Sequence, residues 1–202
     1  MKSNIISDNE ITKITAVCRL PYYTDIPDVG LLLDQTARLV NGYLDPLDDI
    51  NITNSMISNY VKHQIIARPV KKLYYREQIA SLIFIAIAKT VLSLEDISSL
   101  LEIQRREYSP EAAYNMFREQ FEAALSDRFS NISGRAFTES DFEGSKLSEP
   151  DLNPDRASAD PHGSAQLTSG NFNTYLLKSL INAVAESIHL KQLIKQAAVS
   201  SS

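Results

Sequence analysis

Apolar residues recur every three or four positions along most of the chain, which predicts a mainly helical, all-α protein. The first such segment covers residues 27–43, and its opening proline suits a first helical turn. Residues 42–51 interrupt the period with a proline and three aspartates and are predicted to form a connection. A second, shorter helix is expected from Thr53 or Asn54, either of which can cap it, to about His63.

A basic hairpin is predicted after this short helix. Within residues 66–74, Pro69 blocks helix, and residues that favour β-structure flank Lys71 and Lys72, as in a small wing. A third helix is expected over about residues 76–89. Since that helix has hardly any polar face, it should form the buried centre of the domain.

Two further helix starts are marked by capping signals. The run Ser93-Leu94-Glu95-Asp96 matches a capping box, which predicts a fourth helix from this point. Pro110 after a serine announces a fifth helix, which should reach about Phe129 and carry an apolar residue every fourth position. We therefore expect a first domain over residues 27–108 and a long helix over residues 109–129.

The rest of the chain divides into an extension, a loop and a last helix. Residues 1–26 are an N-terminal extension with no assigned role, and residues 130–171 form an acidic Ser/Gly/Pro-rich stretch predicted to be a flexible loop. Residues 172–198 return to helical period. The apolar stripe of this last helix comprises Leu177, Leu180, Ile181, Val184, Ile188, Leu193 and Ile194. It must pack either on the fifth helix or against a second chain, and the pattern leaves both options open.

Charge is distributed unevenly along the chain. The net charge is −5, yet residues 50–76 contain five basic residues and no acidic one, so this stretch carries +5 and the remainder −10. The basic charge coincides with the predicted short helix and wing. This clustering of basic residues favours a nucleic-acid partner, although the net charge of the whole chain is negative.

Several other classes of protein find no support in the sequence. The single cysteine, Cys18, cannot form an internal disulfide, and the first residues lack the apolar run of a secretory signal, which together favour the cytoplasm. The most apolar run, residues 79–92, is interrupted by Lys89 and is shorter than the roughly 20 residues that cross a bilayer. The sequence therefore predicts no membrane span.

Signals for catalysis are also missing. His63, His162 and His189 are scattered, with no further ligand at metal-binding spacing. We find no glycine-rich phosphate loop, paired-carboxylate signature or nucleophile elbow. We therefore expect no metal, no cofactor and no enzymatic activity.

The order of helix, connection, short helix, basic wing, buried helix and capped helix is that of a winged helix-turn-helix. Residues 56–69, Met-Ile-Ser-Asn-Tyr-Val-Lys-His-Gln-Ile-Ile-Ala-Arg-Pro, resemble the recognition-helix pattern of MerR proteins, and Lys71-Lys72-Leu73-Tyr74 resembles their Tyr-Arg-x-Tyr wing. Residues 78–97 resemble the next two helices of that family. The sequence departs from MerR proteins at Gln64, where they have glycine, at Ser58, where they have arginine, and in its longer first connection.

Residues 60–63, 68–72 and 74–80 are more similar to a bacterial family of uncharacterised YkrK-like proteins. That family is described as a domain of unknown function with a MerR-like winged helix-turn-helix. The resemblance implies DNA binding by this fold, followed here by long C-terminal helices.

The candidate DNA contacts follow from residue chemistry. Lys62, Lys71 and Lys72 should meet phosphates, and Arg68 or His63 can reach a neighbouring phosphate. Tyr74 should pack the wing against the helices and offer its hydroxyl to the backbone. The polar candidates for base contacts on the short helix are Asn54, Ser55, Ser58, Asn59 and Lys62. Arg76 completes the predicted DNA-binding set.

We therefore expect a transcriptional regulator that binds double-stranded DNA as a homodimer, paired through the fifth and last helices. Explanations without DNA contact also remain for these features. Asn54 can serve only as a helix cap, and a run of basic residues can be only a solvated surface. The alternative function is a non-catalytic protein-interaction module that keeps the winged-helix fold.

Overall fold

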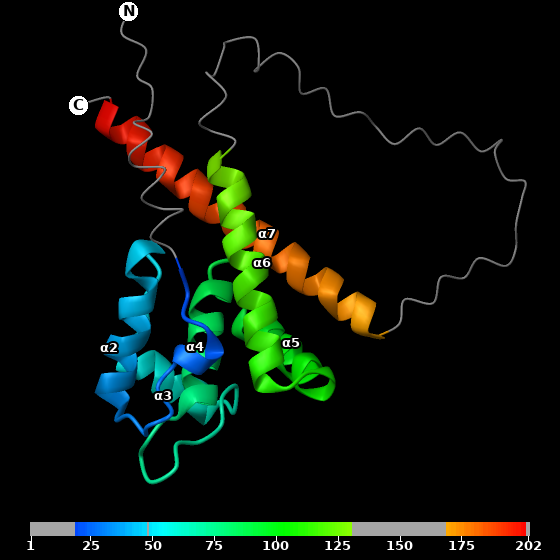
Figure 1. Cartoon of the computed structure of the whole chain (residues 1–202). Helices are drawn as coiled ribbons and strands as arrows, with labels where there is room; N and C mark the ends of the chain where they lie inside the picture. The colour runs from blue at the N-terminus through cyan, green and yellow to red at the C-terminus, as the bar shows by residue number, and fades with distance from the viewer. Residues whose placement is uncertain (1–18, 48, 131–168, 201–202) are drawn as a thin grey trace, which may run out of the picture.

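The computed structural model describes residues 19–47, 49–130 and 169–200 (Figure 1). Within these ranges the chain is mainly helical, as the sequence predicts, and its β-structure is limited to two isolated bridges. The helices are α2 (Leu33–Leu44), α3 (Asn54–Lys62), α4 (Arg76–Ala88), α5 (Leu94–Glu107), α6 (Pro110–Ser130) and α7 (Ser169–Ser200), with 3-10 turns at Tyr23–Asp25 and Asp45–Leu47. The predicted flexible loop lies almost entirely outside the described residues, as does Cys18.

Helix α4 is the centre of the molecule, as its apolar sequence predicts. Leu82, Ile83 and Ile85 on different sides of this helix are all fully buried. The helix contacts α2, α6 and α7, which surround it. None of the helices in the described part of the chain is long and apolar enough to span a bilayer.

The capping signals place three helix starts correctly. The Thr53 hydroxyl accepts the Met56 N–H (3.2 Å) at the start of α3, and the Ser93 hydroxyl accepts the Asp96 N–H (3.1 Å) at the start of α5. The Asp96 carboxylate accepts the Ser93 hydroxyl instead of reaching back to the backbone. Helix α6 begins at Pro110, as expected.

The predicted start of the first helix is wrong by six residues, because α2 begins at Leu33 and not at residue 27. Before it the chain is held extended by the tertiary structure. Leu31 pairs with Tyr74 through two backbone hydrogen bonds, Leu31 N–H to Tyr74 O (2.9 Å) and Tyr74 N–H to Leu31 O (2.8 Å). Val29, an apolar residue of the segment predicted to be helical, is 66% exposed.

Gly30 allows this extended segment to lie against the hairpin. A Cβ atom at Gly30 would be 2.8 Å from Leu73 Cβ, which is closer than real side chains pack. Gly30→Ala should therefore displace the hairpin and lower the free energy of unfolding by about 1–3 kcal/mol, measured by urea denaturation. The matched control is Gly42→Ala in α2, where an added Cβ has no neighbour within 4 Å. That control should raise the free energy of unfolding by about 0.5–1 kcal/mol, and equal effects of both changes would contradict the close approach.

The segment before the first predicted helix has a structural role that sequence patterns did not reveal. Residues 19–26 lie along α6, and Leu20 and Ile26 are part of the core. The Leu20 N–H donates to Glu122 Oε1 (3.0 Å), and Arg118 Nε donates to Leu20 O (2.9 Å). Two side chains of α6 therefore satisfy both backbone groups of one residue.

Arg118 is the buried cation at the centre of this contact. It is only 6% exposed, it pairs with Glu122 (3.0 Å), and its guanidinium lies 3.7 Å from the centre of the Tyr22 ring. Burial raises the pKa of Glu122, while Arg118 and the Leu20 amide act to lower it. Arg118→Lys keeps the charge but loses the hydrogen bond to Leu20 and the stacked guanidinium. We expect it to cost about 2 kcal/mol in urea denaturation, and an unchanged midpoint would show that the charge alone suffices.

Helix α7 packs back on α6 of its own chain, which is the first of the two arrangements that the sequence left open. The stripe residues Leu177, Ile181 and Val184 are buried where α7 crosses α6 (Figure 1). An ion pair between Arg128 and Glu186 joins the same two helices. The stripe is shorter than predicted, because Ile194 is exposed. The side chains of Phe129 and Leu193, also expected on apolar faces, lie outside the described residues.

Candidate nucleic-acid interface

Helix α3 presents a polar face to solvent at the end of the molecule away from α7 (Figure 1). Ile57 and Tyr60 anchor the opposite face of the helix in the core. Burial raises the pKa of the Tyr60 hydroxyl. The exposed residues of α3 are Asn54, Ser55, Ser58, Asn59 and Lys62. All five candidates for base contacts are therefore accessible.

The loop that follows α3 is fastened from two other helices. Ile65 and Ile66 are buried, while the neighbouring His63 and Arg68 are exposed. Arg105 on α5 donates to Ile65 O (2.9 Å), and Gln78 on α4 donates to Ala67 O (3.0 Å). These bonds hold the backbone of the loop, from which His63 and Arg68 extend into solvent.

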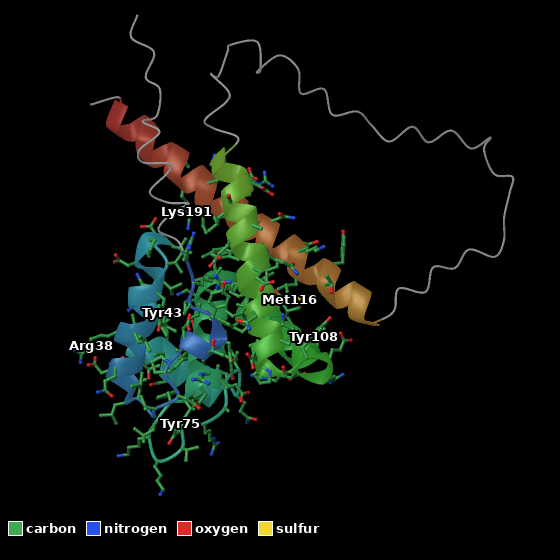
Figure 2. All side chains as sticks on the ribbon, viewed as in Figure 1. Arg38, Tyr43, Tyr75, Tyr108, Met116 and Lys191 are labelled. Carbon is green, nitrogen blue, oxygen red and sulfur yellow. The ribbon has the colours of Figure 1, made fainter. Side chains whose placement is uncertain are left out.

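Lys71 and Lys72 form the tip of a two-residue hairpin. Val70 and Leu73 exchange backbone hydrogen bonds of 3.0 and 2.9 Å, and both lysines have positive φ angles, 50° and 68°. This pattern is that of the I′ hairpin turn, which Asn-Gly fills best. A lysine in the left-handed region costs about 1 kcal/mol at each position. Side chains of this loop project away from the molecule at the end marked by Tyr75 (Figure 2).

Tyr74 and Arg76, two residues of the predicted DNA-binding set, make contacts within the fold. Tyr74 is buried, and it packs the hairpin against the helices as expected. Arg76 Nε donates to Ile26 O (2.7 Å), and its guanidinium lies 5.7 Å from the Tyr23 ring and 3.8 Å from Asp28. The sequence could not reveal this, because the partners of Arg76 lie about fifty positions earlier in the chain.

Arg105 is a member of the site that the sequence analysis missed. With Arg68, Gln64 and Glu77 it lines a surface hollow beside the loop after α3. The sequence marks Arg105 only as a cation in the last turn of α5, a position that the helix dipole favours for positive charge. That signal says nothing of its contact with Ile65, forty positions earlier.

The chemistry of this surface is that of cationic and amide side chains. Among the described residues, no group of three or more His, Cys, Asp or Glu is placed to hold a metal ion. His162 lies outside the described residues. The accessible groups can neutralise anions and donate or accept hydrogen bonds, which are the two kinds of contact that nucleic acids offer.

Comparison with known proteins gives one match. A family profile described as "Domain of unknown function (DUF1836)" matches residues 21–117. No curated protein and no solved structure matches the chain. The matched range contains α2 to α5, the hairpin and the first part of α6, and α7 lies outside it. The candidate interface therefore lies wholly within a segment that is similar to a domain of unknown function.

Proposed function

We propose that this chain is a transcriptional regulator that binds double-stranded DNA with the exposed face of α3 and with the hairpin 70–73, as a MerR-like winged helix-turn-helix. The observation that carries the proposal is the pair of lysines held in left-handed conformation at the hairpin tip. Strained backbone tends to persist where a function requires it. Asn-Gly would form this turn at lower cost, so the lysines are explained by what their ammonium groups contact.

Charge and position together favour the phosphate backbone as that contact. Lys62, Arg68, Lys71 and Lys72 are exposed along one stretch of chain that contains no acidic residue. Each phosphate that such a residue neutralises releases counterions, which stabilises the complex in a salt-dependent way. The hairpin and the end of α3 thus supply affinity without sequence preference.

Sequence preference would come from the amide and hydroxyl groups of α3. Asn54, Ser58 and Asn59 are exposed on this helix, and an asparagine can form two hydrogen bonds with adenine in the major groove. A nine-residue helix is long enough for this purpose, since recognition helices contact bases with only three or four side chains.

The backbone at Gln64 supports the MerR-like assignment. Its φ angle is 58°, in the left-handed region that glycine adopts at the lowest cost. The MerR pattern has glycine at this position, directly after the recognition helix. A shared backbone turn would explain why the chain keeps this conformation although the residue differs.

A homodimer remains part of the proposal, because paired half-sites raise affinity and specificity. The stripe first expected to pair two chains is buried within one chain. A dimer would therefore use the other face of α7, where Tyr175, Leu190 and Ile194 are exposed. Sedimentation equilibrium, which measures the molecular mass in solution, tests this with the full chain and with its Leu190→Glu variant. A wild-type chain that is monomeric at every protein concentration would contradict the dimer.

Fluorescence anisotropy tests DNA binding directly. The full chain is titrated into labelled duplex from its own upstream region and into random duplex, at several salt concentrations. We expect binding that weakens steeply with salt, together with tighter binding of the upstream duplex at each salt concentration. Absence of binding to either duplex at low salt would overturn the proposal.

An alternative is a protein-interaction module, and one observation favours it. Val29, Leu32 and Val70 are exposed on the two segments that the Leu31–Tyr74 bridge joins. Exposed apolar side chains around a hairpin suit a protein partner. Binding of this kind would depend little on salt, so the salt series separates the two functions.

A further inference from the structure

A cavity lies between α4, α5 and α6. Its volume is about 50 Å³, and it is partly open to solvent. One water molecule needs roughly 10–15 Å³ on this scale, so the cavity has room for more than a single water. Its walls include Phe84, Leu101, Gln104, Tyr108, Ala113 and Phe117.

Gln104 and Tyr114 give this apolar cavity two buried donors. They are 7% and 5% exposed, and neither Gln104 Nε2 nor the Tyr114 hydroxyl has a hydrogen-bond partner among the described residues. A buried amide N–H without an acceptor is unfavourable, so such groups are rare in folded proteins. The cavity therefore combines aromatic walls with two donors that lack acceptors, and a few polar groups in an apolar hollow are typical of small-molecule sites.

We propose that this cavity binds a small, uncharged, single-ring aromatic molecule whose carbonyl oxygen accepts a hydrogen bond from Gln104 Nε2. The ring would lie against Phe84 and Phe117, which already pack edge to face with centroids 5.0 Å apart. The one acidic and one basic side chain at the cavity, Glu77 and Arg105, balance each other, which fits a ligand without net charge.

The cavity is joined to the candidate interface by Arg105. This residue lines the cavity and also donates to Ile65 O in the loop after α3. Arg105 and Glu77 also line the hollow that contains Arg68. A ligand that moves Arg105 would change how the loop is held, and we infer that occupancy regulates DNA binding. This regulatory part rests on the proposed function, whereas the binding site does not.

The binding site is tested by titrating acetophenone into the ¹⁵N-labelled full chain and following its NMR spectrum. Ethylbenzene serves as the comparison, because it has the same ring without the oxygen. We expect a saturable shift of the Gln104 side-chain amide signals, and about 5-fold weaker binding of ethylbenzene. Gln104→Leu should remove this preference, whereas Tyr114→Phe, which deletes the other unpaired donor of the cavity, should leave it unchanged.

A second pair of variants tests the location. Ala113→Leu should fill the cavity and abolish binding, whereas Ala112→Leu, on the exposed side of α6, should leave it unchanged. Absence of a saturable shift with acetophenone would overturn the site, since waters alone would then fill it. Equal affinity for both molecules, or equal effects of both leucines, would overturn the assignment to Gln104 and this cavity.

Regulation is tested by repeating the DNA titration with and without saturating acetophenone. We expect DNA affinity to change by about 5-fold or more, which is the lower range of allosteric coupling. Acetophenone binding with unchanged DNA affinity would overturn the regulatory part alone. Acetophenone binding by a chain that binds no DNA would overturn the proposed function and regulation but support the site.

Discussion

Replacing Lys71 and Lys72 together by glutamate should lower the affinity for duplex DNA by about 100-fold at about 0.1 M salt. Both side chains are exposed at the hairpin tip, and each should neutralise one phosphate. The slope of log affinity against log salt should become shallower by about 1.8, because each lost phosphate contact removes about 0.9. Anisotropy across a salt series measures both quantities.

A matched control variant distinguishes loss of a contact at the hairpin from the effect of a changed net charge. Lys178 and Lys191 are exposed on α7, and Lys191 lies far from the hairpin (Figure 2). The Lys178→Glu/Lys191→Glu variant changes the net charge equally, yet it should alter DNA affinity by less than about 3-fold. An equal loss in both double variants would contradict a contact at the hairpin.

A second variant separates charge from conformation at the same tip. Lys71→Asn/Lys72→Gly introduces the residues that the turn prefers, so the free energy of unfolding should rise by about 1–2 kcal/mol. DNA affinity should fall by about 10-fold, since two cations are lost and no anion is added. A more stable protein with unchanged affinity would mean that the lysines have no role in binding.

Ile181→Glu should lower the free energy of unfolding by about 4 kcal/mol or more, the largest stability change that we expect. Ile181 is 2% exposed in the contact of α7 with α6, so the substitution buries a carboxylate among apolar side chains. Urea denaturation measures the effect. The neighbouring Asn182→Glu, on the exposed side of α7, should stay within about 0.5 kcal/mol of the wild type.

The same variant distinguishes packing within one chain from pairing of two chains. If α7 packs on α6 of its own chain, the destabilisation will not depend on protein concentration. A folded, stable Ile181→Glu monomer derived from a dimeric wild type would instead show that the stripe pairs two chains.

Much of the local structure follows from short sequence signals. Thr53, Ser93 and Pro110 mark the starts of α3, α5 and α6, because a cap or a first-turn proline acts on backbone groups only a few residues away. The burial of α4 follows from its lack of a polar face. The exposed face of α3 was predicted from the spacing of its residues. The helical period alone puts Ile57 and Tyr60 on one side of the helix and their polar neighbours on the other.

The tip of the hairpin was predicted only in part. Pro69 and the flanking β-favouring residues indicate a basic hairpin, but a pair of lysines is not a signal for positive φ angles. Those angles are imposed by the pairing of Val70 with Leu73 and of Leu31 with Tyr74. The second of these pairs joins segments more than forty residues apart.

The sequence by itself determined the number of α-helices in residues 27–108, most of their boundaries and the polar face of α3, because periodicity and capping act over a few residues. Only the tertiary structure decided the partner of α7, the place of residues 19–26, the structural use of Arg76 and the cavity at Gln104. Each of these depends on which distant surfaces meet. Several apolar faces of similar chemistry compete for every such contact, and shape and packing across the whole fold select one of them.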